Sequence, residues 1–540
     1  MAMPDDIAET SFPTVEEPYA RSSLKKRCTL VFCLLMASIA YLGVRTHRPF
    51  FHDDAYITLR YANQWQSGNG PVWNPNERVE GYTSFLHLAV LAPLQKIGIS
   101  PEVSARIVGL CSYLAIWITI VYYSYKTESN QIRRLTKMMI LMGTIPTAFI
   151  TIAWSLGGLE TPLYMLLLMA ATYLFTTFEH NQSMGKAVTV GLLLGLCTLT
   201  RPEAALFVAI TLTTGLLGYK SRKISLCILL VFSVLYMPYF VWRWQYYGDI
   251  FPNTFYAKLG TPLGKRLQDG FYYLHTFLRS APWTVVLALA SWSYTLFKQA
   301  DRRTISWKYM TAISLIATIY IVWTGGDHMP AYRFWAPLIP MYAWFIAHTW
   351  SSQADTATFR QWVLVPTVLI ALSLSQFLVV EERMQNARRA DPAAAIGKQI
   401  GSYISKNFPP QTVIATNSAG AVAYFAPDHY FIDMLGLNDR TIAKRHDFPI
   451  RTHWQQFPGH SKGDGQYVLS RHPNYIILGP AEGTVAHTAN EKKVNIVWFL
   501  SDQEIAEAPS FVSNYELKTV PLSNTLIFSY YERKQATTHP

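Results

Sequence analysis

Long runs of apolar residues fill the first two thirds of the chain, and short polar segments separate them. Runs of this length match the thickness of a bilayer and lack the short alternations of a soluble core, so they predict transmembrane helices. Eleven spans can be drawn, of which several are nearer 16 than 20 residues long. The predicted spans are 27–44, 104–124, 135–153, 160–178, 184–199, 202–218, 224–243, 281–298, 307–324, 333–349 and 361–380.

A further apolar stretch at 83–97 (TSFLHLAVLAPLQKI) is short and contains His87, Pro93 and Gln95. We predict that it lies at the membrane interface and does not span. With eleven spans and an interior N-terminus, the basic loops SSLKKR, KTESNQIRRLTK and YKSRK all lie inside. Another span at 83–97 would reverse every later loop and move YKSRK outside, against the positive-inside rule.

From residue 381 the pattern changes to short segments typical of a soluble α/β domain. We expect helices at 391–407 and in SAGAVAYFA, and strands in QTVIATN, HYFIDMLG, YIILG, NIVWFL and TLIFSYYE. The chain is therefore expected to have three parts. These are a cytoplasmic tail at 1–26, a transmembrane domain at 27–380 with its first periplasmic loop at 45–103, and a periplasmic α/β domain at 381–540.

The net charge of +12 invites a nucleic-acid-binding interpretation. Residues 381–540, however, hold 16 Lys and Arg against 15 Asp and Glu, which leaves 30 against 19 for the remainder. The basic excess thus belongs to the membrane part, where topology explains it, and no nucleic-acid partner is expected. All five cysteines fall within apolar spans, so neither a disulfide framework nor a cysteine metal site is expected.

Two adjacent carboxylates, Asp53 and Asp54, begin a short amphipathic segment directly after the first span. Charged groups beside hydrocarbon are costly and are therefore functional candidates. An aspartate at this position could take a proton from a hydroxyl that attacks an anomeric carbon, while its neighbour orients the acceptor or binds a cation. The alternative is a solvated loop whose acidic residues merely begin a helix.

Five cations on the same predicted face are suited to a phosphate near the membrane surface, namely Arg60, Arg201, Lys258, His328 and Arg333. For each of them, the alternative is a side chain that reaches the interface or pairs with a helix end. Asp327 follows two glycines that either permit close backbone approach to a ligand or form a plain turn, and Glu160 either joins the site or begins a helix. Tyr256 belongs to a set of aromatic residues that either stack on a sugar or polyprenyl group or form an interfacial belt.

The string HDDAYITLRYANQWQSGNGPVWNPNERVEGYTSFL, with LTRPE, GDIFPNTFYAK and GGDHMPAYRFWAPLIP, resembles the GT-C superfamily of membrane glycosyltransferases. Within it, the chain is most similar to arabinofuranosyltransferases that use polyprenyl-phosphate-arabinose, including the mycobacterial terminal β-1,2 enzymes and pilin-modifying relatives. The resemblance implies that Asp53 is the base, with Asp54 beside it. It also implies two interfacial helices in the first loop, at 54–66 and 83–97, and a donor phosphate near Arg60, Arg201, Lys258 and Arg333.

The activity implied by this resemblance is transfer of a sugar, D-arabinofuranose, from a polyprenyl phosphate to an envelope glycan, lipopolysaccharide or pilin at the periplasmic face of the inner membrane. One base and one displacement would invert the sugar. Another donor sugar such as mannose, a lipid-linked sugar transporter and a non-catalytic scaffold are alternatives. Asp53, Asp54 and Asp327 either hold a divalent cation (Mg, Mn or Ca) or act without one. The large polymerising relatives carry a C-terminal β-sandwich that is not evident in this sequence.

Overall fold

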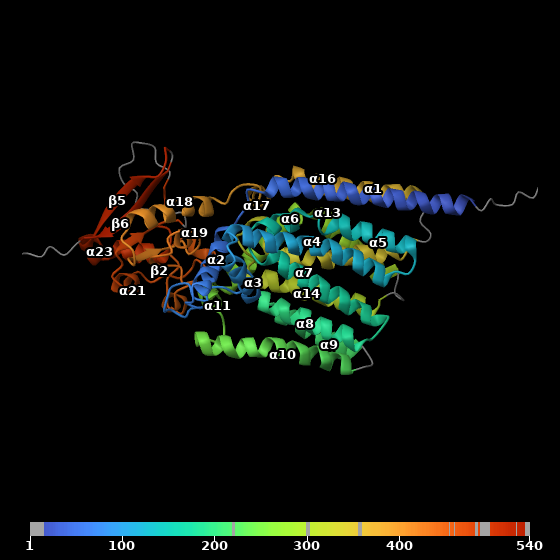
Figure 1. Cartoon of the computed structure of the whole chain (residues 1–540), viewed down its shortest axis with the longest axis horizontal. Coiled ribbons are helices and arrows are strands. Elements are labelled where there is room, and N and C mark those ends of the chain that lie inside the picture. Colours follow the sequence, from blue (N-terminus) through green and yellow to red (C-terminus); the bar gives the residue numbers. More distant parts are fainter. Residues whose placement is uncertain are drawn as a thin grey trace, which may run out of the picture.

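The computed structural model of the chain describes residues 16–218, 222–298, 303–354, 359–452, 454–457, 459–480, 484–485, 497–524 and 526–534. The molecule is elongated, with a helical bundle at one end and a sheet-containing part at the other (Figure 1). Residues 1–15 of the predicted cytoplasmic tail lie outside the described part, and from Glu16 onward the tail belongs to the first helix, α1 (Glu16–His47).

Every predicted span overlaps a helix, and the helical character of the first two thirds of the chain is confirmed. Within the described residues, five helices are long and apolar enough to cross a membrane: α1, α4 (Pro101–Thr127), α7 (Thr161–Thr176, continued to Glu179), α10 (Arg222–Tyr247) and α14 (Ile305–Thr324). The other helices at predicted spans are shorter: α8 (Met184–Thr200), α9 (Ala204–Gly218), α13 (Pro282–Lys298), α15 (Ile339–Ser351) and α16 (Phe359–Ser375). The count of eleven crossings therefore stays a prediction.

The predicted span at 135–153 is broken into two helices, α5 (Gln131–Thr144) and α6 (Phe149–Leu156), which meet at an angle of 60°. Pro146 lies in the break, where its missing N–H interrupts the helical hydrogen bonds. The carbonyl of Pro146 accepts a hydrogen bond from the Tyr113 hydroxyl (2.7 Å), so the break is held by a neighbouring helix.

Both interfacial helices predicted in the first loop are present, as α2 (Asp53–Gln66) and α3 (Phe85–Lys96), and they pack against each other. The segment between α10 and α14 also contains α11 (Asn253–Lys258) and α12 (Leu263–Ser280). Sequence periodicity in apolar runs did not predict α12, because its polar face carries Lys265, Arg266 and Asp269. A 3₁₀ segment, η3 (Pro330–Leu338), precedes α15.

The C-terminal part is built on a mixed sheet. Strand β1 (Val413–Thr416) lies between β2 (Tyr430–Asp433) and β3 (Tyr475–Ile477), and both pairings are parallel. Strand β6 (Ile527–Arg533) runs antiparallel to β3, to the short β4 (Thr484–Val485) and to the whole of β5 (Tyr515–Pro521). The helices of this part are α17 (Glu382–Asn386), α18 (Pro392–Asn407), α19 (Ala421–Tyr424), α20 (Arg440–Ala443), α21 (Gly465–Ser470), α22 (Leu500–Glu507) and α23 (Pro509–Asn514).

Most predicted C-terminal elements are found, but the strand expected in NIVWFL is wrong where the structure describes it. Residues 495–496 lie outside the described part, 497–499 are not in a strand, and Leu500 begins α22. The side chains of Phe499 and Leu500 are buried, which explains the apolar run without a strand. Strand β5 was missed because its sequence, YELKTVP, contains no apolar run and most of its residues are exposed.

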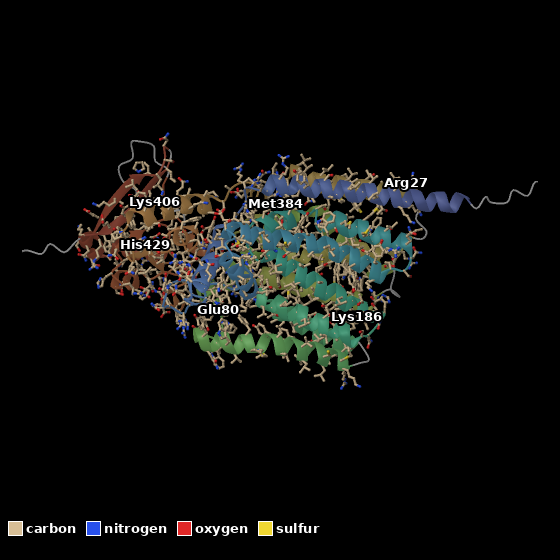
Figure 2. The ribbon with its side chains drawn as sticks, viewed as in Figure 1. Arg27, Glu80, Lys186, Met384, Lys406 and His429 are labelled. Carbon is tan, nitrogen blue, oxygen red and sulfur yellow. The ribbon has the colours of Figure 1, made fainter. Side chains whose placement is uncertain are left out.

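The first loop joins the bundle to the C-terminal part. Figure 2 shows Arg27 and Lys186 towards the far end of the bundle, Glu80 at the junction, and Lys406 and His429 in the sheet-containing part. Glu80 forms a buried ion pair with Arg243 near the end of α10. The Glu80 carbonyl also accepts a hydrogen bond from the backbone N–H of Asn253 (2.9 Å). The first loop, α10 and α11 are thus fixed to one another at the junction.

Candidate functional site

A cavity of about 810 Å³ lies between the bundle and the C-terminal part. Its walls come from the start of α2, the α8–α9 connection, α11, the segment from α14 to η3, the start of α18 and the turn between β1 and α19. Eight of the ten predicted site residues line it: Asp53, Asp54, Glu160, Arg201, Lys258, Asp327, His328 and Arg333. Segments that are far apart in sequence therefore converge on one site, as predicted.

The two adjacent aspartates face different surroundings. Asp53 is buried, with 7% of its surface exposed, and its Oδ1 accepts a hydrogen bond from the backbone N–H of Ala421 (2.8 Å) in the C-terminal part. By contrast, 38% of the Asp54 side chain is exposed. Burial raises the pKa of Asp54, but His52, Arg333 and Lys258 lower it more, so the net shift is downward. Asp54 is therefore an ionised carboxylate that is accessible from the cavity.

The start of α2 is fixed by His52 and Asp391. The His52 ring accepts the backbone N–H of Asp54 at Nδ1 (3.2 Å), which caps the helix, and its Nε2 lies 3.9 Å from Asp391 Oδ2. Asp391 Oδ2 accepts the backbone N–H of Asp53 (2.8 Å), while Oδ1 accepts the N–H of Ala393 (3.0 Å) at the start of α18. One carboxylate thus ties α2 to α18.

The cations of the cavity differ in their partners. Arg201 is bound by Glu160 at 2.5 Å and by Glu203, and Arg333 Nε lies 3.1 Å from Asp327 Oδ2. Lys258 has no ion-pair partner within the described part of the chain, and its side chain is exposed to the cavity. Desolvation lowers the pKa of Lys258, and Arg333 and Arg201 lower it further. An anion that binds here would relieve this repulsion.

Arg333 is presented by an unusual backbone. Gly325 and Gly326 end α14 with positive φ angles of 89° and 69°, and Ala331 and Tyr332 have φ angles of 48° and 46°. Left-handed conformations are costly for residues with a side chain, and they persist only when their surroundings hold them. Here the Ala331 carbonyl accepts a hydrogen bond from Trp154 Nε1 (3.1 Å). Gly325 is the left-handed C-cap of α14, and Gly326 lines the cavity. Close approach of this backbone to a ligand stays a prediction.

His328 lines the cavity but is not a cation at neutral pH. Burial lowers the pKa of His328 well below its ordinary value, and the His460 ring, whose centroid lies 5.2 Å away, lowers it further. His328 can therefore offer a hydrogen bond to a ligand, but the charge that the sequence analysis assigned to it is absent.

Two predicted site residues do not line the cavity. Arg60 is 1% exposed, and its guanidinium donates to the backbone carbonyls of Trp73 (2.8 Å), His429 (3.1 Å) and Ala423. It lies 5.2 Å from the ring centroid of Trp73, so it binds the C-terminal part to α2 and cannot reach a donor phosphate. Tyr256 does not line the cavity either, and its ring centroid lies 5.0 Å from Lys444 Nζ.

The predicted alternative in which Asp53, Asp54 and Asp327 hold a divalent cation stays a prediction. Among the described residues, no three His, Cys, Asp or Glu side chains gather as metal ligands. Asp327 is paired with Arg333, and Asp53 accepts a backbone N–H, so these carboxylates are already engaged.

Several residues of the cavity wall were not predicted from the sequence, including Asp391, Asn417, Ser418 and Gly420. The Asp391-Pro392 pair is a usable signal, because aspartate followed by proline is typical of a helix start. The sequence of residues 417–420, NSAG, is typical of an ordinary turn of small residues and indicates no binding role. Only the packing of this turn against α2 brings it to the site.

Comparisons with known proteins agree with this arrangement. Residues 380–532 match a family described as a domain of unknown function (DUF8728). The chain is 25% identical over 268 residues to a terminal β-(1→2)-arabinofuranosyltransferase of Mycobacterium tuberculosis, covering 47% of this chain and 42% of the relative. It is 23% identical over 357 residues to the protein of the same name in Corynebacterium glutamicum, covering 57% and 49%. The match thus spans less than half the length of either relative.

Solved structures decide the fold. ArnT from Cupriavidus metallidurans, bound to undecaprenyl phosphate, superposes with a TM-score of 0.53 at 12% identity, covering 75% of this chain and 85% of ArnT. The Archaeoglobus fulgidus oligosaccharyltransferase, in complex with Zn and sulfate, gives 0.54 at 11% identity, covering 83% and 67%. The chain therefore shares the fold of ArnT and of this oligosaccharyltransferase. The predicted resemblance to GT-C proteins and to terminal arabinofuranosyltransferases is confirmed, and the GT-C fold with its apolar helices indicates a multi-pass membrane protein.

Proposed function

We propose that this GT-C chain transfers D-arabinofuranose from a polyprenyl phosphate to a hydroxyl group of an envelope glycan, lipopolysaccharide or pilin. The reaction takes place at the periplasmic face of the bacterial inner membrane. The names of the two relatives support the sugar. ArnT bound to undecaprenyl phosphate, and the A. fulgidus enzyme in complex with a dolichol phosphate, support the lipid donor.

One observation carries the proposal: an accessible carboxylate and an unpaired ammonium face the same cavity. Asp54 and Lys258 both line it, and Lys258 is among the groups that lower the pKa of Asp54. Transfer from a lipid phosphate needs a cation for the phosphate and a base for the attacking hydroxyl. Within the described part of the chain, these two residues are the best placed for the two tasks.

The cavity also has an apolar edge suited to a lipid tail. Phe251, Phe255 and Trp323 line the cavity and have exposed rings, so they are in contact with both the cavity and the surroundings of the bundle. A polyprenyl chain could lie against these rings while its phosphate reaches Lys258. This combination favours transfer from a lipid donor over transport or scaffolding.

In the proposed reaction, Asp54 takes the proton of the acceptor hydroxyl as its oxygen attacks the anomeric carbon. The bond between that carbon and the phosphate oxygen breaks, and the polyprenyl phosphate leaves with the electron pair. Phosphate is a good leaving group and needs no proton, so Lys258, Arg333 and Arg201 have only to stabilise its charge. A single displacement inverts the anomeric carbon.

Asp54 replaces Asp53 in the role of the base that the sequence analysis assigned. Asp53 supports the site, because its carboxylate holds the turn that begins at β1 against α2. The lowered pKa of Asp54 describes the site without a donor. A bound phosphate would offset the charges of Lys258 and Arg333, so Asp54 would become a stronger base once the donor is in place.

A transfer assay with the purified full chain tests the proposal. We expect transfer from radiolabelled polyprenyl-phosphate-arabinose to envelope glycan, lipopolysaccharide or pilin acceptors. Asp54→Asn is expected to lower kcat by about 10²–10⁴-fold with little change in donor KM, and Asp53→Asn to cost less. Near-normal turnover by Asp54→Asn would contradict the assignment of the base. If the unaltered chain transferred arabinose to none of the acceptors, the proposed function would be contradicted. If it preferred a mannose donor, mannose would take the place of arabinofuranose in the proposal.

A further inference from the structure

One wall of the cavity comes from the C-terminal part. The turn between β1 and α19, residues 417–420, lines the cavity and contacts the start of α2. The backbone N–H of Ala421, next in the chain, donates to Asp53 Oδ1, and Asp54 follows Asp53 directly. Whatever binds at this turn therefore lies close to the proposed base.

The turn holds two oxygen atoms that lack hydrogen-bond partners. Asn417 Oδ1 and Ser418 Oγ are both buried and unpartnered, and the two residues are only 3% and 2% exposed. Leaving a buried polar atom without a partner costs about 1–3 kcal/mol, and native proteins keep few such atoms. Two such oxygens in adjacent residues of a cavity wall indicate a ligand that donates the missing hydrogen bonds.

Neighbouring contacts fix which atom of Asn417 is presented. Its Nδ2 donates to the Gly479 carbonyl (3.0 Å) and to Asp502 Oδ1 (2.8 Å). Asp502 is itself held by the backbone N–H groups of Trp498, Phe499 and Gly479. The amide therefore cannot turn over without losing both of its donor bonds, and Oδ1 remains as a hydrogen-bond acceptor.

The surrounding charge excludes a phosphate at this wall. Asp53, Asp54 and Asp391 are all close to the turn or to the start of α2, whereas the cations Lys258, Arg201 and Arg333 come from the bundle side. A neutral group with several hydrogen-bond donors fits the two oxygens, and the hydroxyl groups of a sugar ring are such donors. A serine or threonine of a protein acceptor brings a single hydroxyl, which is consumed in the reaction.

We propose that Asn417 and Ser418 form the acceptor subsite and bind hydroxyl groups of a carbohydrate acceptor beside the hydroxyl that attacks. This inference rests on the proposed function and narrows the acceptor to a glycan. The subsite lies within residues 380–532, which match the domain of unknown function. The proposed role of this domain is to hold the acceptor beside Asp53 and Asp54 at the start of α2.

Ser418→Ala is the cleanest test, because the Ser418 hydroxyl has no protein partner to lose. The matched control is Ser461→Ala, which removes another buried, unpartnered hydroxyl from the C-terminal part but does not line the cavity. With an arabinofuranose disaccharide as acceptor, Ser418→Ala is expected to raise the acceptor KM about tenfold. The donor KM and the melting temperature should remain unchanged, and Ser461→Ala should change none of the three.

An unchanged acceptor KM in Ser418→Ala, a rise in the donor KM instead, or efficient transfer to a serine-containing peptide that Ser418→Ala does not affect would each overturn the subsite. The proposed function would still stand if the unaltered chain transfers the sugar. A separate measurement covers the case in which it does not. The arabinofuranose disaccharide alone should raise the melting temperature of the unaltered chain and of Ser461→Ala, but not that of Ser418→Ala, and equal shifts in all three would overturn the subsite.

Discussion

Adjacent aspartates at the start of α2 have different surroundings because of helical geometry. Successive side chains on a helix point about 100° apart, since there are 3.6 residues per turn. When Asp53 points at the C-terminal turn and accepts the Ala421 N–H, Asp54 is directed elsewhere, and it lies open to the cavity. The sequence predicted the pair, but the order of the two roles depends on where the C-terminal turn packs.

The two basic residues Lys258 and Arg60 should respond differently to removal of their charge. Lys258 lines the cavity and has no ion-pair partner among the described residues, so Lys258→Met removes the proposed phosphate ligand without breaking an ion pair. We expect the donor KM to rise by about 10- to 100-fold, because a charge-assisted hydrogen bond contributes about 1.5–3 kcal/mol. The melting temperature should change little. Steady-state kinetics with varied donor would check this, and an unchanged donor KM would contradict it.

Arg60→Met is the matched comparison. Its loss leaves the buried carbonyls of Trp73, Ala423 and His429 without their hydrogen-bond donor, and each buried acceptor left unsatisfied costs about 1–3 kcal/mol. Thermal unfolding should therefore start at a lower temperature, while the donor KM of the folded fraction stays near that of the unaltered chain. If the donor KM rose as much as in Lys258→Met, the result would support the sequence-based prediction that Arg60 binds the donor phosphate.

At the scale of elements, the turn between β1 and α19 has no room for a larger residue. A Cβ on Gly420 would overlap the carboxylate and the backbone oxygen of Asp53. This close approach lets the turn lie directly on α2, so that the Ala421 N–H reaches Asp53 Oδ1 at 2.8 Å. Glycine is thus needed here for space.

Gly420→Ala should therefore displace Asp53 and open the cavity wall. We expect kcat to fall by at least about tenfold, since small misplacements of reacting groups have large effects on rate. Gly264→Ala in α12 is the control, because its Cβ would meet nothing within 4 Å. Transfer rates and melting temperatures of both variants would be measured. Full activity in Gly420→Ala would mean that the turn does not need to touch Asp53.

The sequence predicted elements well where an apolar run decides the structure. All eleven runs overlap helices, and the two short helices expected in the first loop are present as α2 and α3. The interfacial position that charge asymmetry predicted for α3 stays a prediction. It predicted less where distant packing decides. Arg60 was misjudged because nothing in FHDDAYITLRYA reveals that the C-terminal part covers that side of α2. Asn417 and Ser418 were missed because a turn of small polar residues has no distinguishing pattern until its unpartnered atoms are seen.

At the scale of the whole molecule, the site exists only where two parts meet. The bundle contributes Lys258, Arg201 and Arg333, and the C-terminal part contributes Asn417 to Gly420. Buried contacts across the junction hold the parts together, among them the Asn253 side chain, which donates to the carbonyls of Gly436 and Leu437 (both 2.9 Å). In the proposed reaction, the bundle would bind the donor and the C-terminal part would bind the acceptor.

Orientation in the membrane follows from the same division. Arg27 lies towards the end of the bundle opposite the sheet, and Lys406 lies in the sheet-containing part (Figure 2). Both are exposed. If basic loops face the cytoplasm, Lys406→Cys should react with a membrane-impermeant maleimide in cells with a permeabilised outer membrane, whereas Arg27→Cys should react only after lysis. The reverse pattern would place the cavity in the cytoplasm and contradict the periplasmic assignment.

The bond between Asp391 and the start of α2 links positions 338 residues apart. A ribosome that adds about 5–20 residues per second needs roughly 20–70 s to synthesise that interval. During this time the first loop has already emerged from the ribosome. The start of α2, however, lacks its contacts with Asp391 and with the turn between β1 and α19. If the chain transfers a sugar as proposed, its site is incomplete until the C-terminal part has been synthesised. We therefore expect unfinished chains to lack transferase activity.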